Sequence, residues 1–240
     1  MIVSMAELVM RLAGVVAFPL LTAIALYRGG LAAGLSRRTS VTVAVGAAAL
    51  WGAWIGISTA LAAAGVYRDP GPAPWFGVAI LGALLAALLA TRIPVVARIL
   101  AAPGSANRLV WPQAVRILGV TWLIALAQGT LPAVFALPAG LGDIATGVSA
   151  LLLIRRWRPR SAVWLNVFGL VELLIALTIG YLGGASAQTV LPLTPSTIGV
   201  TVLPVALNPT TVVSLALALH IVSLARLRTA TRPAATPAPA

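Results

Sequence analysis

The chain has 240 residues, of which 60% are hydrophobic and 8% are charged, and its 16 basic residues outnumber its 4 acidic ones. Soluble globular domains contain about 25% charged residues, so this composition predicts an integral membrane protein. The positive charge does not indicate a nucleic-acid partner, because the arginines separate apolar runs instead of forming one basic surface. Cysteine is absent, which excludes disulfides, thiolate nucleophiles and cysteine-ligated metals.

The N-terminal apolar run begins at Met1, and Glu7 precedes the first basic residue, Arg11. A cleavable signal peptide would begin with a basic segment, so we interpret this run as the first membrane span. Glu7 and Arg11 are four residues apart on this helix and are expected to pair with each other.

A helix needs about 20 apolar residues to cross the hydrocarbon core of a bilayer. Seven runs of suitable length are found, at residues 5–27, 40–66, 75–91, 112–130, 133–154, 161–183 and 204–225. They predict an all-α fold, a polytopic bundle of seven transmembrane helices that forms one domain over residues 1–225. The tail at 226–240 consists mostly of Arg, Thr, Pro and Ala, and we expect it to be disordered.

Several segments between the spans, and the start of the fourth span, have sequence features that predict their local structure. Residues 95–101 are interpreted as a short interfacial segment, and residues 103–108 as a polar turn. Pro112 suits the first position of a helix, where its missing N–H would have no partner anyway. This start would leave Arg116 in the first turn of the fourth span, from which its side chain can reach the membrane surface. Residues 184–203 are uncharged and rich in β-branched residues, which favours an extended flap.

The distribution of arginine predicts the orientation, because short arginine-rich loops stay in the cytoplasm. The loops after the first, third and fifth spans and the tail contain Arg28, Arg37, Arg38, Arg92, Arg98, Arg108, Arg155, Arg156, Arg158, Arg160, Arg226, Arg228 and Arg232, whereas the opposite loops contain Arg68 alone. We therefore expect the N-terminus outside, the C-terminus in the cytoplasm, and a multi-pass location in the cell membrane with lipid as the surrounding partner.

Two of the four acidic residues, Asp143 and Glu172, lie near the middle of apolar spans. A charge at the bilayer centre costs about 2.5–3.5 kcal/mol on insertion scales, so such residues usually face the bundle interior and mark a site. Each carboxylate lies about ten residues, roughly 15 Å, from the start of its span. The two spans are joined by a short turn, so they are expected to be antiparallel neighbours, and close carboxylates would share one proton.

The sequence around Asp143 has two interpretations. Pro138, Gly140 and Gly142 precede it, and such a cluster at mid-membrane can interrupt a helix and expose backbone groups to a ligand. The alternative is close packing, because Ala136, Gly140, Asp143 and Gly147 form a face of mostly small residues that a neighbouring helix can approach. Both interpretations remain open from the sequence.

Other polar residues inside the spans are candidate members of the same site. They are Trp54, Trp122, Asn166 and His220. Buried tryptophans need an acceptor for the indole N–H, and a midplane carboxylate would serve, although packing is the simpler explanation of their position. His220 is the only histidine, so it is either a proton relay or a structurally hydrogen-bonded side chain; neither a metal site nor a cofactor is predicted.

Three functional hypotheses follow. The first is a small transporter or permease in which Asp143 and Glu172 form a proton- or cation-linked site for a small solute, with His220 as a relay. The second is a non-catalytic membrane subunit whose carboxylates are structural and whose protein partner the sequence does not identify. The third is an intramembrane enzyme that uses the two carboxylates as acid and base. A cavity that touches both carboxylates would favour the first or the third hypothesis, and a dry, satisfied network the second.

Overall fold

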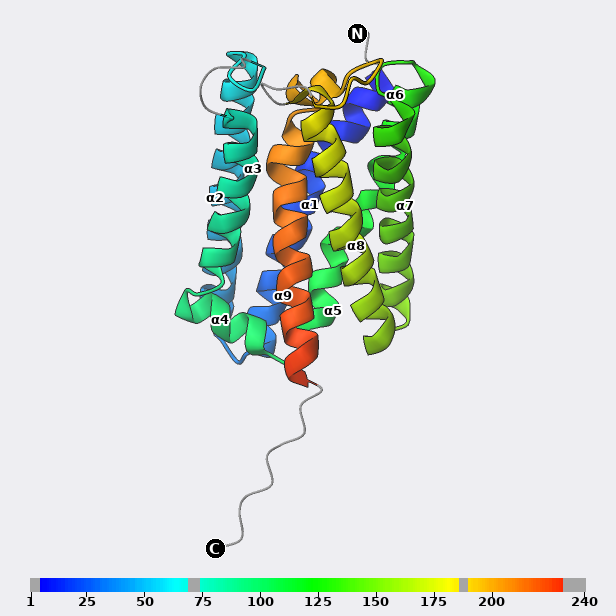
Figure 1. The fold of residues 1–240 in the computed structure, drawn as a ribbon. Coiled ribbons are helices and arrows are strands. Elements are labelled where there is room, and N and C mark those ends of the chain that lie inside the picture. The colour runs from blue at the N-terminus through cyan, green and yellow to red at the C-terminus, as the bar shows by residue number, and fades with distance from the viewer. Residues whose placement is uncertain (1–4, 69–73, 186–189, 231–240) are drawn as a thin grey trace, which may run out of the picture.

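The computed structural model describes residues 5–68, 74–185 and 190–230. Within these ranges all regular elements are helices and none is a strand, which confirms the prediction of an all-α fold. The helices stand side by side in an elongated bundle (Figure 1). The first helix, α1 (Met5–Ala32), starts at one end of this bundle, and the last, α9 (Ser214–Ala230), finishes at the other.

Besides α1 and α9, the bundle contains four further long helices, three of them single helices and one built from three consecutive segments. They are α2 (Arg37–Ala63), α7 (Ala133–Arg155), α8 (Pro159–Gly180), and a segment made of α5 (Ser105–Val110), the 3-10 helix η1 (Trp111–Gly119) and α6 (Val120–Ala127). A π-helix, η4 (Asn208–Val213), leads into α9, and α3 (Trp75–Ala90) is bent by 78° from α4 (Pro94–Ala101). The described residues thus contain six helices long and apolar enough to cross a membrane, or seven if the bent pair is one span.

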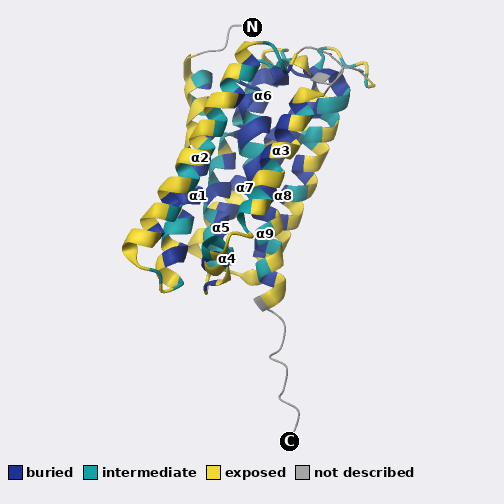
Figure 2. Cartoon of the chain, turned by 90° about the vertical axis from the view of Figure 1, so that its left-hand side faces the viewer, coloured by how far each residue is buried: buried dark blue, intermediate teal, exposed yellow. Residues whose placement is uncertain are grey.

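The outer surface of the bundle is apolar. Large hydrophobic side chains such as Leu81, Leu152 and Val45 are about 60% exposed or more. Exposed residues lie on the outside of the helices and buried residues on the inside (Figure 2). A surface of this kind is stable only in contact with an apolar solvent, so the chain is a multi-pass membrane protein that contacts the lipid bilayer.

The fourth span begins earlier than the sequence predicts. Gly104 adopts a φ of 72°, and the helix starts at Ser105, so the polar turn expected at 103–108 is mostly helical. Pro112 does not start the helix; the chain continues past it as the 3-10 helix η1. Proline removes one backbone donor from the α-helical ladder, and a change of helix type accommodates that loss.

Other boundaries also differ from the sequence-based spans. The interfacial segment expected at 95–101 is α4, which lies across one end of the bundle (Figure 1). The flap expected at 184–203 contains η2 (Tyr181–Ala185) at its start and the 3-10 helix η3 (Thr197–Thr201), with no strand among its described residues. Helix α9 extends to Ala230, beyond the expected 225, and residues 231–240 of the expected tail lie outside the described ranges, as does Asp69.

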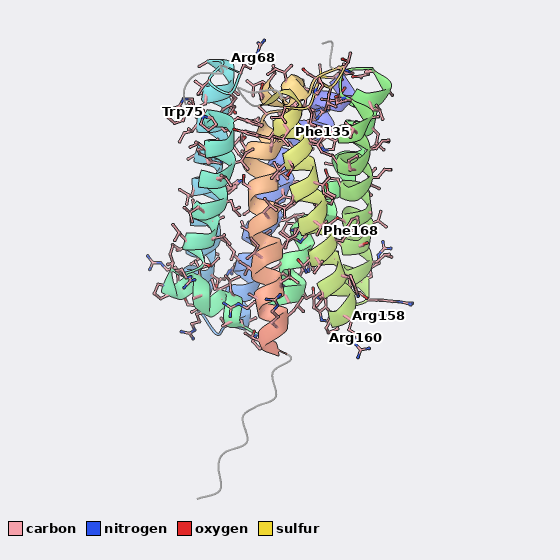
Figure 3. All side chains as sticks on the ribbon, in the orientation of Figure 1. Arg68, Trp75, Phe135, Arg158, Arg160 and Phe168 are labelled. Carbon is pink, nitrogen blue, oxygen red and sulfur yellow. The ribbon has the colours of Figure 1, made fainter. Side chains whose placement is uncertain are left out.

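Arginine is distributed unevenly between the two ends of the bundle. Arg68 lies at one end, together with the start of α1, whereas Arg158 and Arg160 lie at the opposite end, with α4 and the end of α9 (Figure 3). We call these the Arg68 end and the Arg158 end. The side of the membrane that each end faces remains a prediction from the positive-inside rule.

Candidate functional site

Arg116 lies at the centre of a buried polar cluster and not at the membrane surface. The sequence-based expectation was wrong because the span starts at Ser105, which puts Arg116 eleven residues, or about 16 Å, inside the helix. The residue is only 5% exposed. A guanidinium at this depth must have compensating partners, because burial of an isolated charge is too costly.

Both midplane carboxylates supply such partners. Arg116 Nε donates to Asp143 Oδ1 at 2.6 Å, and Arg116 Nη2 donates to Glu172 Oε2. Asp143 projects from α7 and Glu172 from α8, two helices that pack against each other and carry these residues at similar depth. The structure therefore brings the two carboxylates to one guanidinium, a partner that sequence reasoning did not assign to them.

His220 and Asn166 extend the cluster from Arg116 toward the Arg158 end. Arg116 Nη1 lies 3.1 Å from His220 Nε2, and His220 Nδ1 lies 2.9 Å from Asn166 Oδ1. Asn166 Nδ2 donates to the backbone oxygen of Ala162 and to Ser223 Oγ, which leaves its Oδ1 as the acceptor facing His220. Arginine only donates, so His220 Nε2 accepts, Nδ1 carries the proton and the ring is neutral.

A second ion pair lies beside the cluster on the other flank. Glu7 and Arg11 pair at 2.8 Å, as expected from their spacing. Arg11 also donates to the backbone oxygen of Thr121 and lies 5.1 Å from the ring centre of Trp122. Trp122 in turn donates its indole N–H to Asp143 Oδ2 at 3.1 Å. Trp122 therefore links the two ion pairs through one hydrogen bond and one cation–π contact.

The structure contradicts the broken-helix interpretation of Pro138, Gly140 and Gly142. Helix α7 continues through all three residues, so no backbone gap opens there. Close packing explains the glycines instead. A Cβ on Gly142 would lie 2.9 Å from Glu172 Cδ, and one on Gly140 would lie 2.6 Å from Leu123 Cδ2. These glycines let neighbouring helices approach closely enough for the carboxylates to reach Arg116.

Trp54 does not join this cluster. Its indole N–H donates to the backbone oxygen of Thr210 at 2.9 Å, at the interface between α2 and η4. Nearby, Ser58 Oγ lies 2.7 Å from Thr210 Oγ1 and 3.1 Å from the Tyr67 hydroxyl. This separate set of hydrogen bonds attaches α2 to the bundle, and Trp54 has a structural contact there.

The charges of the central cluster do not balance. Arg116 brings one positive charge, Asp143 and Glu172 bring two negative charges, and His220 is neutral. Arg11 cannot supply the missing charge, because its own partner is Glu7. In addition, Glu172 Oε1 is buried and has no hydrogen-bond partner. With both carboxylates ionised, the cluster has one excess negative charge and a buried acceptor without a partner, both of which a proton or a cation would satisfy.

A cavity of about 490 Å³ reaches the two carboxylates. It extends from Pro74, Leu182 and Val200 toward Asp143 and Glu172, and its walls include Phe135. Phe135 lies toward the Arg68 end (Figure 3), as do the loops that contain Leu182 and Val200. The cavity therefore leads from the Arg68 end to the carboxylates, and its volume is within the range of ligand sites, about 300–1,000 Å³.

The opposite side of the cluster is closed. His220, Asn166 and Ser223 are each 1% exposed or less. Beyond them, toward the Arg158 end, an apolar cluster packs between α5, α7, α8 and α9, made of Val110, Ala150, Leu153, Ala162, Leu165 and Leu227. The carboxylates are thus reached by a cavity from one end of the bundle and separated from the other end by packed side chains.

The contacts of His220 bear on whether this cluster could coordinate a metal. Both nitrogens of His220 are already used, one by Arg116 and one by Asn166. No group of three or more His, Cys, Asp or Glu residues suited to a metal occurs in the described ranges. Of the sequence-predicted site residues, Asp143, Glu172, His220, Asn166 and Trp122 converge, and Trp54 lies elsewhere.

Sequence reasoning missed Arg116 as a member of the site. The signal that could have identified it was the apolar run Leu109, Val110 and Trp111 before Pro112, which allows the span to start earlier. A start near Ser105 puts Arg116 at the same depth as the two carboxylates. It then becomes a third mid-membrane charge of opposite sign, and opposite charges at equal depth are natural partners.

Comparison with known proteins gives a family but no named function. No curated protein and no solved structure matches the chain. One family model matches residues 73–228, which is more than half of the chain and runs from the segment before α3 almost to the end of α9. The matched region contains Arg116, Asp143, Asn166, Glu172 and His220, whereas Glu7 and Arg11 precede it. The chain belongs to the family described as Domain of unknown function (DUF8737).

Proposed function

We propose that this protein is a small transporter of the cell membrane in which Glu172, with Asp143 and Arg116, forms a proton- or cation-linked site. The observation that carries the proposal is a ligand-sized cavity that reaches two carboxylates paired with a single guanidinium. An excess buried charge is costly and is retained where it binds something. Binding of a proton or cation at Glu172 would make the cluster neutral and would occupy the free Oε1.

The asymmetry of access supports the same proposal. A transporter exposes a midplane site to one side of the membrane at a time, by rocking one part of the bundle against another. The cavity gives access from the Arg68 end, whereas His220, Asn166 and the apolar cluster around Ala162 close the Arg158 end. This arrangement is what one of two alternating states requires.

Cysteine accessibility tests the proposal directly, because the natural chain has no cysteine. Ala176 is half-buried in the cavity wall, and Ala162 is fully buried at the closed end. We expect a membrane-impermeant thiol reagent to modify Ala176→Cys only from the Arg68 side. Ala162→Cys should be modified only from the Arg158 side and only in the alternative state, favoured by changing pH or replacing sodium with potassium.

The two labelling rates should change in opposite directions when the state changes. A cavity that closes at one end while the other end opens would support transport. If Ala162→Cys stays unmodified under every condition and the rate at Ala176→Cys is constant, the bundle does not alternate. That result would contradict the transport proposal and favour a static membrane subunit.

One observation favours this static alternative and makes it the second candidate function. Arg116 makes polar contacts with three side chains on α7, α8 and α9, so it ties η1 to three neighbouring helices. In a purely structural network, every charged member would be needed for stability. The unpartnered Glu172 Oε1 and the adjoining cavity are the features that a structural role does not explain.

A further inference from the structure

We infer that the cavity binds a lipophilic organic cation, a molecule with a positive centre surrounded by aromatic or alkyl groups, and holds its charge beside Glu172. The inference rests on the proposed function and names the substrate class of the same site. It is carried by the contrast between the charged inner end of the cavity and its apolar walls.

The charge at the inner end excludes anions. Apart from Asp143 and Glu172, the residues that line the cavity are uncharged. The nearby guanidinium of Arg116 is already occupied by both carboxylates, so it offers little to an incoming anion. Glu172 lines this inner end, is 6% exposed and has one buried carboxylate oxygen without a partner, so an incoming ligand meets acidic groups there. A cation is the complementary ligand.

The walls favour a ligand with an apolar body over a hydrated metal ion. Four aromatic rings line the cavity, from Phe76, Trp122, Phe135 and Tyr181. Trp122 and Phe135 pack edge to face with ring centres 5.4 Å apart. Aromatic faces attract organic cations through their quadrupole and also provide apolar contact. A small hydrated ion would gain nothing from these walls and would leave most of the 490 Å³ unused.

The cavity is bounded on one side by residues that are also exposed on the outer surface of the bundle. Val78 and Leu81 on α3 line it and are 47% and 65% exposed on the surface of the bundle. Thr178 on α8 also lines it and is exposed. A ligand that partitions into the bilayer can therefore enter between α3 and α8. The same cationic chemistry is found in membrane-dissolved compounds and in lipid-like amphiphiles, and the ligands used in the test separate these two sources.

Equilibrium binding to the purified, detergent-solubilised protein tests the inference. Tetraphenylphosphonium and tetraphenylborate have nearly the same size and shape and opposite charge. We expect the phosphonium to bind and the borate to bind at least about tenfold more weakly. Dodecyltrimethylammonium represents the lipid-like source; if it binds more tightly than the phosphonium, the natural ligand is an amphiphile, and the reverse order indicates a compact aromatic cation.

Three variants locate the binding. Glu172→Gln should weaken phosphonium binding by about tenfold or more, because the amide keeps the shape and removes the charge. Ala176→Phe keeps every charge but fills the cavity, and it should reduce binding by a similar factor. Arg156→Gln removes a charge that is exposed at the end of α7, outside the cavity, and should leave the affinity within about twofold of wild type. Thermal unfolding of each variant verifies that it is folded.

The outcomes separate this inference from the transport proposal. Equal binding of the phosphonium and the borate, or binding that Glu172→Gln and Ala176→Phe leave unchanged, would overturn it, even if the cysteine labels show alternating access. If the phosphonium binds in a Glu172-dependent way while the labels show a static bundle, the cation site stands and transport fails. If Glu172→Gln does not fold, two comparisons still test the inference: phosphonium against borate binding, and phosphonium binding to Ala176→Phe against wild type.

Discussion

Arg116 shows how much can depend on one residue in this bundle. It donates to Asp143 and Glu172 and contacts His220, from the middle of a membrane-length helix. Its removal would leave two carboxylates facing each other without a counter-charge. Replacement of one carboxylate by its amide would instead leave an ion pair of zero net charge. The two kinds of substitution should therefore differ greatly in their effect on stability.

We expect Arg116→Met to lower the free energy of unfolding by about 3–5 kcal/mol, the usual cost of removing one partner from a buried ion pair. Glu172→Gln should stay within about 1 kcal/mol of wild type or be more stable, since functional charges are commonly kept at the expense of stability. Denaturant titration in mixed micelles measures both. Losses of similar size in the two variants would indicate a structural network and weaken the case for a ligand at Glu172.

At the scale of elements, helix α7 approaches η1 closely through glycine. A Cβ on Gly147 would meet the backbone of Arg116 and Ile117, with Arg116 C at 3.0 Å, and backbone cannot rotate away as a side chain can. The contact positions the segment that carries Arg116 against the helix that carries Asp143. The glycines of α7 thus act on the site through helix packing and not through an interruption of the helix.

Substitution of this glycine should therefore separate the two helices. We expect Gly147→Ala to destabilise the protein by about 1–3 kcal/mol, the usual cost of overpacking. Gly52→Ala is the matched control, because Gly52 is exposed on α2 with no heavy atom within 4 Å of an added Cβ. The control should be neutral or stabilising by up to about 1 kcal/mol, since alanine is the better helix former. Similar losses in both variants would argue against the close contact.

The helices whose ends agree best with the sequence-based spans are those that are bounded by a proline or an arginine. The prediction of 133–154 agrees with α7, which follows Pro132 and ends at Arg155, and 75–91 agrees with α3, which follows Pro74. The fourth span was misplaced because Pro112 is compatible both with a helix start and with a change of helix type. That error also removed Arg116 from the site, since the assumed start placed it at the surface.

The site itself could be predicted only in part from the sequence. A charge in the middle of an apolar run is visible without a structure, which is why Asp143 and Glu172 were candidates. Their meeting point depends on which helices pack together and at what depth, and helix packing is set by tertiary contacts. The partner helix of Trp54 is an example: Thr210 is 156 residues away in the chain, and no local pattern connects them.

For the whole molecule, the unequal distribution of arginine predicts how the bundle is inserted. Arg158 and Arg160 lie at the end opposite Arg68 (Figure 3), and arginine-rich short loops stay in the cytoplasm. Helix α3 connects the two ends although its 16 residues span only about 24 Å, and α4 then lies across the Arg158 end. Counting α3 and α4 as one span gives up to seven crossings among the described residues, and we then expect the start of α1 outside and the end of α9 inside.

Single cysteines at the two ends test this orientation in intact cells. Ser161 is exposed at the start of α8, next to Arg160, and Val190 is 61% exposed and donates its backbone N–H to the backbone oxygen of Leu182, just beyond the other end of α8. We expect an impermeant thiol reagent outside the cell to modify Val190→Cys and to leave Ser161→Cys unmodified until the membrane is permeabilised. The unsubstituted chain, which lacks cysteine, is the control for background labelling. The reverse pattern would place the mouth of the cavity in the cytoplasm, so that the carboxylates would receive their ligand from inside the cell.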